Sequence, residues 1–214
     1  MTQKHLFKNC ILSFVAHAIM INAYPELFFE QTWDGKNYSI QDGYARRGTI
    51  TFQDNFCIGA IRNECGRIIY GRKEIAKYMD GFPNYVTEIA NKETLEYLLD
   101  YHGNEIVPAI TSVFWCDEKM LYWGKQDKQQ ILEDCSLLET LFLPFDNALE
   151  QIKIYYDMTP SAVQLLLELV EQKDNDLSKQ IVLSKHQQKN IPGGALNDVC
   201  IEALREINIA LCGI

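Results

Sequence analysis

The sequence predicts an α+β protein, in which an antiparallel sheet of about five strands, built from hairpins, packs with an N-terminal helix and a C-terminal helical half. Two observations lead to this prediction. The candidate strands occur in neighbouring pairs joined by short polar turns, as in hairpins. The candidate helices gather toward the two ends of the chain instead of alternating with strands, and such segregation indicates an α+β fold and not a doubly wound one.

The chain begins with a predicted helix over residues 3–23. Its apolar residues recur at helical spacing: Phe7, Ile11, Phe14 and Ala18. Pro25 ends it, because the residue before a proline avoids the helical conformation. A secretory signal sequence is the alternative, but the apolar run contains Ser13 and His17 and is too short to span a bilayer. We therefore expect a core helix in a cytoplasmic protein.

Residues 30–46 are expected to form a long loop that leads into a hairpin. The loop contains two Asp-Gly turns and several aromatic residues. Residues 47–53 and 56–64 follow, and their side chains alternate between two faces. This pattern predicts a pair of strands with a two-residue turn at Asp54-Asn55. Along the first strand one face is polar, so we expect it either to face solvent or to line a site.

The remaining elements are predicted from apolar periodicity and from cap residues. Gly103 is expected to end a helix, and Thr159 followed by Pro160 is expected to begin one. The predicted strands are 67–70, 109–116 and 120–124. The predicted helices are 73–80, 91–102, 127–142, 145–156, 160–173 and 196–210. A length of 214 residues suits a single domain over 1–214, with a subdivision near residue 105 as the alternative.

Net charge is unevenly distributed along the chain. The total is −9, of which residues 1–107 carry −2 and residues 108–214 carry −7. Such an acidic half repels nucleic acid and anionic membranes, and it attracts a basic protein partner. The alternative interpretation is that the acidic surface only keeps the protein soluble.

No linear motif indicates a metal site, a cofactor or a catalytic apparatus. The seven cysteines form an odd set without a Cys-x-x-Cys pair, which is typical of reduced thiols in a cytoplasmic protein and argues against a zinc site. The four histidines, including His17 in the N-terminal helix, do not adjoin a recognised nucleophile. We therefore expect neither a metal nor a cofactor.

The loop and first hairpin are the strongest candidate for a ligand site. Cations, an aromatic residue and carboxylates are concentrated there: Trp33, Asp34, Arg46, Arg47, Arg62 and Glu64. Arginine binds carboxylate or phosphate in a bidentate manner. The competing interpretation is that the arginines pair with Glu30, Asp34 or Asp42 and only hold the loop in place.

Three functions remain open at this point. The charge distribution favours a binding or interaction protein, for example an immunity or inhibitor protein that neutralises a basic partner. The alternative is an enzyme, either a hydrolase or a transferase, that acts on a small anionic substrate at residues 30–64. A structural subunit of a homo-oligomer is the third.

Overall fold

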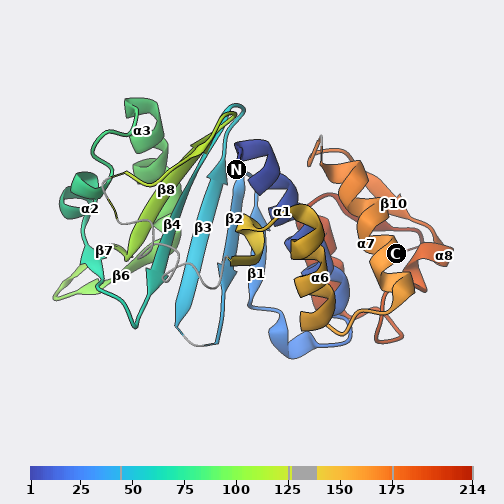
Figure 1. Cartoon of the computed structure of the whole chain (residues 1–214). Coiled ribbons are helices and arrows are strands. Elements are labelled where there is room, and N and C mark those ends of the chain that lie inside the picture. Colours follow the sequence, from blue (N-terminus) through green and yellow to red (C-terminus); the bar gives the residue numbers. More distant parts are fainter. Residues whose placement is uncertain (44, 125, 127–138, 175, 214) are drawn as a thin grey trace. The chain divides into compact units, whose positions relative to one another are not determined.

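The structure is a computed structural model that describes the whole chain except residues 44, 125, 127–138, 175 and 214 (Figure 1). The chain forms two compact units. Unit 1 contains residues 1–5 and 36–139, and unit 2 contains residues 6–35 and 140–214. The helices and the largely antiparallel six-stranded sheet confirm the predicted α+β class. The boundary between the units does not lie near residue 105, and the folding of the chain as one domain stays a prediction.

The main sheet has the strand order β1-β2-β3-β4-β8-β9. These strands are β1 (Gln31–Asp34), β2 (Asn37–Gln41), β3 (Arg46–Phe52), β4 (Phe56–Asn63), β8 (Ser112–Asp117) and β9 (Leu121–Tyr122). The predicted first hairpin is confirmed as β3 and β4. The backbone N–H of Gln53 donates to the carbonyl of Phe56 at 2.8 Å, so the turn is Asp54-Asn55. Gly59 lies opposite Phe114, whose ring occupies the space that a Cβ would need.

The expected long loop over residues 30–46 is wrong for most of its length, because β1 and β2 occupy it. The chain reverses at Gly35, whose positive φ of 59° is accessible to glycine. Polar cross-strand contacts hold β2 to β3. The Ser39 and Thr49 hydroxyls lie 3.1 Å apart, and the Thr51 hydroxyl donates to Asn37 at 2.7 Å.

The middle of the polar face of β3 is covered by its own unit, so it does not face solvent at Thr49 and Thr51. Thr49 and Thr51 are buried. The hydroxyl of Thr51 lies 2.7 Å from that of Thr94, in the short helix η2 (Thr94–Leu98) that contacts β3 and β4. Hydroxyl pairs satisfy these buried polar groups without a ligand.

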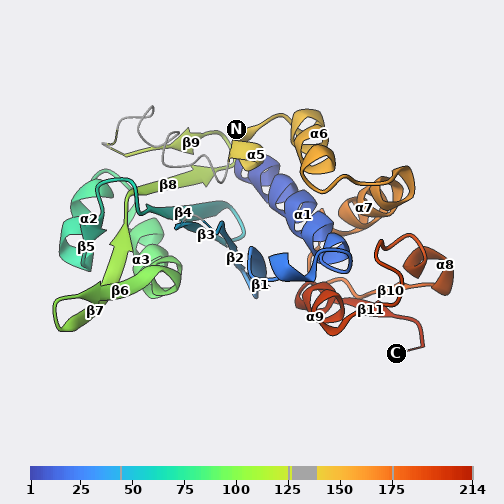
Figure 2. The same cartoon turned by 90° about the horizontal axis from the view of Figure 1, so that it is seen from below.

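The other helices of unit 1 lie on one face of β3, β4 and β8 (Figures 1 and 2). They are α2 (Arg72–Tyr78) and α3 (Asn84–Lys92). A smaller antiparallel sheet has the order β5-β7-β6, with β5 (Ile69–Tyr70), β6 (Leu99–His102) and β7 (Glu105–Ile110). The core between helices and strands includes Ile58, Ile75, Val86, Leu95 and Val113.

The helix predicted over 91–102 is wrong over residues 99–102. The structure has η2 followed by the strand β6, which pairs with β7 around a turn at Gly103-Asn104. Gly103 has a φ of 64°, a value that suits the end of a helix and also a tight hairpin turn. His102 is therefore a strand residue, and its ring stacks on Tyr70 at 4.4 Å.

Unit 2 is mostly helical and includes most of the helix α1 (Gln3–Met20), which is buried nearly all round. Its other helices are η1 (Pro25–Leu27), α5 (Glu139–Phe142), α6 (Phe145–Tyr155), α7 (Pro160–Lys173), α8 (Lys185–Gln188) and α9 (Asp198–Glu206). The predicted helices over 3–23, 145–156 and 160–173 are confirmed, and the Thr159 hydroxyl accepts a capping hydrogen bond from Ala162. No helix within the described residues is long and apolar enough to cross a membrane.

Two predictions in the C-terminal half need correction or lie outside the described residues. The helix expected over 196–210 ends at Glu206, and β11 (Ile209–Leu211) follows it. This strand pairs in parallel with β10 (Ile181–Leu183), and neither strand was predicted. Most of the helix predicted over 127–142 lies outside the described residues.

Candidate functional site

The arginines predicted to form a site lie at one end of the β3–β4 pair in unit 1. The register places Arg47 directly opposite Arg62, and Arg46 opposite Asn63. Arg62 is the most enclosed of the three, with a side chain that is 6% exposed, and its Nη2 atom forms ion pairs with Glu64 and Asp100. The Arg62 guanidinium thus links the main sheet to β6.

The remaining donors of Arg62 indicate what the arginine group, that is Arg46, Arg47 and Arg62, could bind. Its Nε and Nη1 atoms are buried and have no hydrogen-bond partner among the residues that the structure describes. Arg47 adds a second positive charge across the strand pair, and like charges in directly opposite positions repel each other. A small carboxylate or phosphate would relieve that repulsion, although Glu64 and Asp100 already supply part of the compensating charge.

Asp100 is a residue that sequence reasoning missed. The backbone N–H of Tyr101 and the Arg62 guanidinium both hold the pKa of the Asp100 carboxyl below its usual value. The competing interpretation named other partners, of which Asp42 accepts a hydrogen bond from the backbone N–H of Arg46 at 3.0 Å. Asp100 lies 38 residues from Arg62 in the sequence, so no local pattern could indicate this contact.

The other two predicted site residues belong to unit 2. Trp33 is 2% exposed, and its ring packs edge-on against Phe14 at 5.9 Å between centroids. Its indole N–H donates to the carbonyl of Gly35 at 3.1 Å. Trp33 is therefore an interior residue of unit 2. Asp34, the next residue, is exposed.

Asp34 belongs to a group of carboxylates with Glu202 and Glu206 of α9, hereafter the α9 carboxylates. Glu202 and Glu206 are one helical turn apart, and α9 contacts β1. Burial raises the pKa of the Glu206 carboxyl, and the negative charges of Asp34 and Glu202 raise it further. The backbone N–H of Trp33 donates a hydrogen bond to the Glu206 carboxylate at 2.6 Å, which lowers the pKa and partly offsets this effect. These charges repel one another, so a cationic group placed beside them would be attracted.

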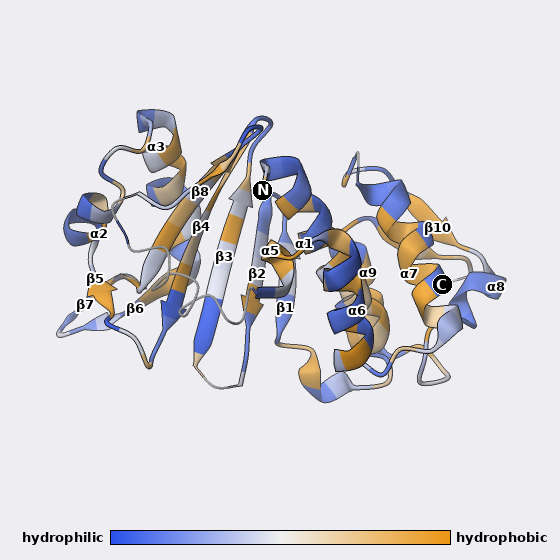
Figure 3. Cartoon of the chain, in the orientation of Figure 1, coloured by the Kyte–Doolittle hydropathy of each residue, from blue (hydrophilic) through white to orange (hydrophobic). Residues whose placement is uncertain are grey.

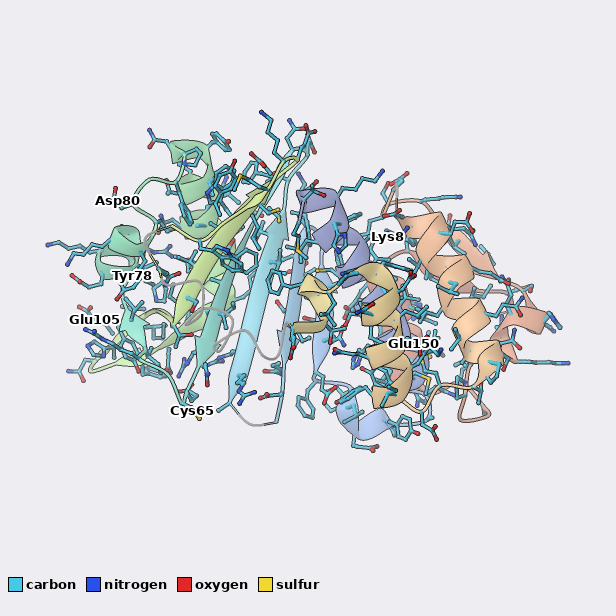
Figure 4. All side chains as sticks on the ribbon, in the orientation of Figure 1. Lys8, Cys65, Tyr78, Asp80, Glu105 and Glu150 are labelled. Carbon is cyan, nitrogen blue, oxygen red and sulfur yellow. The ribbon has the colours of Figure 1, made fainter. Side chains whose placement is uncertain are left out.

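The cations of unit 2 compensate this charge only in part. Unit 2 contains 13 acidic and seven basic residues, whereas unit 1 contains 16 and 13. Lys173 is fully buried, and its ammonium donates to backbone carbonyls, including that of Leu177 at 3.0 Å. Lys8 pairs with Asp174 at 3.3 Å, and Lys153 pairs with Glu150 at 2.7 Å (Figure 4 labels Lys8 and Glu150). Three of the seven cations are thereby engaged inside the unit.

Unit 2 also exposes large apolar side chains around η1 and the end of α6. Phe28 is 56% exposed and Phe29 is 38% exposed, and their rings meet edge-on at 6.0 Å. Tyr155 and Ile154, at the C-terminal end of α6, are 60% and 78% exposed. The Tyr155 hydroxyl donates to the carboxylate of Glu30 at 2.8 Å, which brings the end of α6 beside the segment that carries the phenylalanines.

A chain of buried polar groups runs through unit 2, but it is enclosed. The Ser13 hydroxyl donates to Gln31 at 3.1 Å, Gln31 approaches the hydroxyl of Tyr156, and that hydroxyl lies 3.1 Å from Nδ1 of His17. Burial lowers the pKa of His17 to about 4 and raises that of Tyr156. Both side chains are therefore neutral near pH 7, as internal hydrogen-bonding groups usually are.

One open hollow of about 540 Å³ lies beside α2 and α3 of unit 1, lined by Arg72, Thr87, Glu88, Asn91 and Lys92. Arg72 is bound there by Glu96 and by the carbonyl of Asn91. The mixture of opposite charges gives the hollow no clear preference for a ligand. Within the described part of the chain, no three or more His, Cys, Asp and Glu side chains are grouped so that they could hold a metal ion.

The six described cysteines are thiols, while Cys135 lies outside the described residues. Comparison with protein-family models, with curated proteins and with solved structures gives no match to this chain.

Proposed function

We propose that the protein is a cytoplasmic binding protein whose unit 2 engages a basic protein partner. The observation that carries this proposal is the crowding of the α9 carboxylates, Asp34, Glu202 and Glu206, in a unit with nearly twice as many acidic as basic residues. An immunity or inhibitor protein that neutralises a basic toxin is one form of this function.

The proposal rests on the excess of acidic over basic residues in unit 2 and on the proximity of these carboxylates. Burial is the main reason that the pKa of Glu206 is raised, and the charges of Asp34 and Glu202 add to it, so bringing these carboxylates together costs free energy. A lysine or arginine from a partner would lower that cost, and long-range attraction would accelerate the encounter. Three cations of unit 2 already have partners within the unit, so they are less able to repel such a ligand.

The test uses polylysine as the basic probe and isothermal titration calorimetry as the readout. Neutralising the α9 carboxylates with Asp34→Asn, Glu202→Gln and Glu206→Gln should weaken binding at low salt by about tenfold, because each lost exposed pair contributes roughly 0.5 kcal/mol. Glutamine at 206 retains an oxygen that can accept the N–H of Trp33.

A control variant removes the same number of negative charges from exposed positions of unit 1. It carries Glu88→Gln, Glu105→Gln and Glu118→Gln. Equal weakening by the two triple variants would contradict the proposal, because binding would then follow net charge alone. Polyglutamate, which should not bind, controls for non-specific association.

A second candidate function is the capture of a small anion by the arginine group of unit 1, as an enzyme or a binding protein. The observation in its favour is the buried Arg62, with two unpartnered donors among the described residues, opposite Arg47. Titration with inorganic phosphate and with acetate, followed by NMR of the arginine side chains, tests it. Arg47→Ala should then abolish the response without lowering the melting temperature, and an unchanged response would exclude this site.

A further inference from the structure

Four exposed apolar residues of unit 2 lie in two segments that are joined by the hydrogen bond between Tyr155 and Glu30. We refer to Phe28, Phe29, Ile154 and Tyr155 as the aromatic patch. Three of its four members are more than half exposed, and the C-terminal end of α6 is visibly hydrophobic (Figure 3). Grouped apolar side chains that stay in contact with water on a folded protein mark interaction surfaces, and aromatic residues supply much of the binding energy at such surfaces.

The segments that carry this patch also contain several carboxylates. The segments 24–31 and 150–158 contain Glu26, Glu30, Glu150 and Asp157 but only one cation, Lys153. That cation pairs with Glu150 at 2.7 Å. Glu30 is held at the patch by the hydroxyl of Tyr155. Two segments of unit 2 that carry exposed apolar side chains and an excess of carboxylates are therefore joined by a hydrogen bond.

We infer that the aromatic patch docks a basic amphipathic segment of a protein partner, in which apolar side chains are flanked by lysine or arginine. The inference rests on the proposed function and names a surface of unit 2, in addition to the α9 carboxylates, that would contact the partner. Apolar side chains of the partner would cover Phe28 and Tyr155, and its cations would face the carboxylates of these segments. Such an occupant matches both the hydrophobicity and the charge of the patch.

The charge argues against the other occupants of an exposed apolar surface. A second copy of this chain docked on the same patch would bring two sets of carboxylates together, and like charges repel. An anionic phospholipid surface would be repelled in the same way. A basic segment is the occupant that relieves the repulsion among these carboxylates.

The experiment compares two probes on the full-length protein. One is a synthetic amphipathic helix of lysine, leucine and tryptophan, and the other is polylysine, which has the charge but no apolar face. The double variant Phe28→Ala and Tyr155→Ala should weaken binding of the amphipathic peptide by at least about tenfold and leave polylysine binding unchanged. Tyr101→Ala, which removes a 72% exposed aromatic side chain from unit 1, is the matched control and should change neither.

Circular dichroism and the melting temperature verify that the variants fold, and Tyr155→Phe, which keeps the ring, should retain most of the binding. If the amphipathic peptide binds equally well to the wild type and to the double variant, the docking inference is wrong. In that case, weaker binding of polylysine to the variant with the α9 substitutions would still support the proposed function. If neither probe binds, both proposals fail. Self-association, or binding to anionic vesicles, that the double variant abolishes would overturn the inference by showing a different occupant.

Discussion

Replacement of His17 with asparagine tests how the interior of unit 2 tolerates a titratable group. His17 is fully buried, and its Nδ1 atom lies 3.1 Å from the Tyr156 hydroxyl. Burial lowers its pKa from an ordinary 6.5 to about 4. Between these values the unfolded chain binds the proton more readily than the folded protein, so the free energy of unfolding falls as the pH decreases from about 6.5 to about 4.

The difference between the pKa values of His17 in the folded and unfolded states changes the free energy of unfolding by about 3 kcal/mol once both states are fully protonated. Between pH 7.5 and pH 5 the change is about 2 kcal/mol. Asparagine keeps a hydrogen-bonding group near the position of Nδ1 but does not titrate in this range. Urea unfolding at the two pH values should therefore show that the wild type loses about 2 kcal/mol more than the variant on acidification.

His186→Asn is the matched control, because His186 is exposed, and it should leave the pH dependence of the wild type unchanged. Equal losses on acidification for the wild type and His17→Asn would refute the reasoning. Such a result would mean that the buried imidazole is reached by water or finds a partner for its charged form.

Three further predictions follow from the packing. Phe14→Asp should abolish soluble expression because it places an unpaired charge beside Trp33. The control Phe28→Asp, at a position that is 56% exposed, should fold normally. Equal expression of the two variants would contradict the core role of α1. Arg62→Met should lower the free energy of unfolding by about 2 kcal/mol because Glu64 and Asp100 lose their partner. Arg47→Ala should leave the melting temperature nearly unchanged. A larger loss of stability in Arg47→Ala than in Arg62→Met would contradict the observed ion pairs. Thiol titration of the denatured protein should find all seven cysteines reactive, and a smaller number would indicate a disulfide.

Elements with strong local signals were predictable. The strands β3 and β4 alternate in side-chain character, and α7 begins with Thr159 as its cap and Pro160 in its first turn. The hairpin β1–β2 was missed because the burial of its strands depends on tertiary contacts, such as the packing of Trp33 against Phe14. Gly103 was misinterpreted because a positive φ serves helix ends and hairpin turns alike.

The candidate site was less predictable than the fold. The sequence indicated that Arg62 and Glu64 share one face of a strand, and they do form an ion pair. It could not indicate Asp100, since that contact depends on the pairing of β6 with β7. The aromatic patch was equally hidden, because Phe28 and Phe29 resemble core residues in the sequence, and only packing determines that they are exposed.

The central claim is that unit 2 binds a basic partner through its carboxylates. An NMR titration of the isotopically labelled protein with polylysine tests this claim most directly, since the amide shifts report where the probe lies. The account predicts that the largest shifts occur at Asp34 and in α9, and that they disappear at about 0.5 M salt. Shifts of similar size at exposed carboxylates of unit 1, such as Glu88 and Glu105, would contradict it.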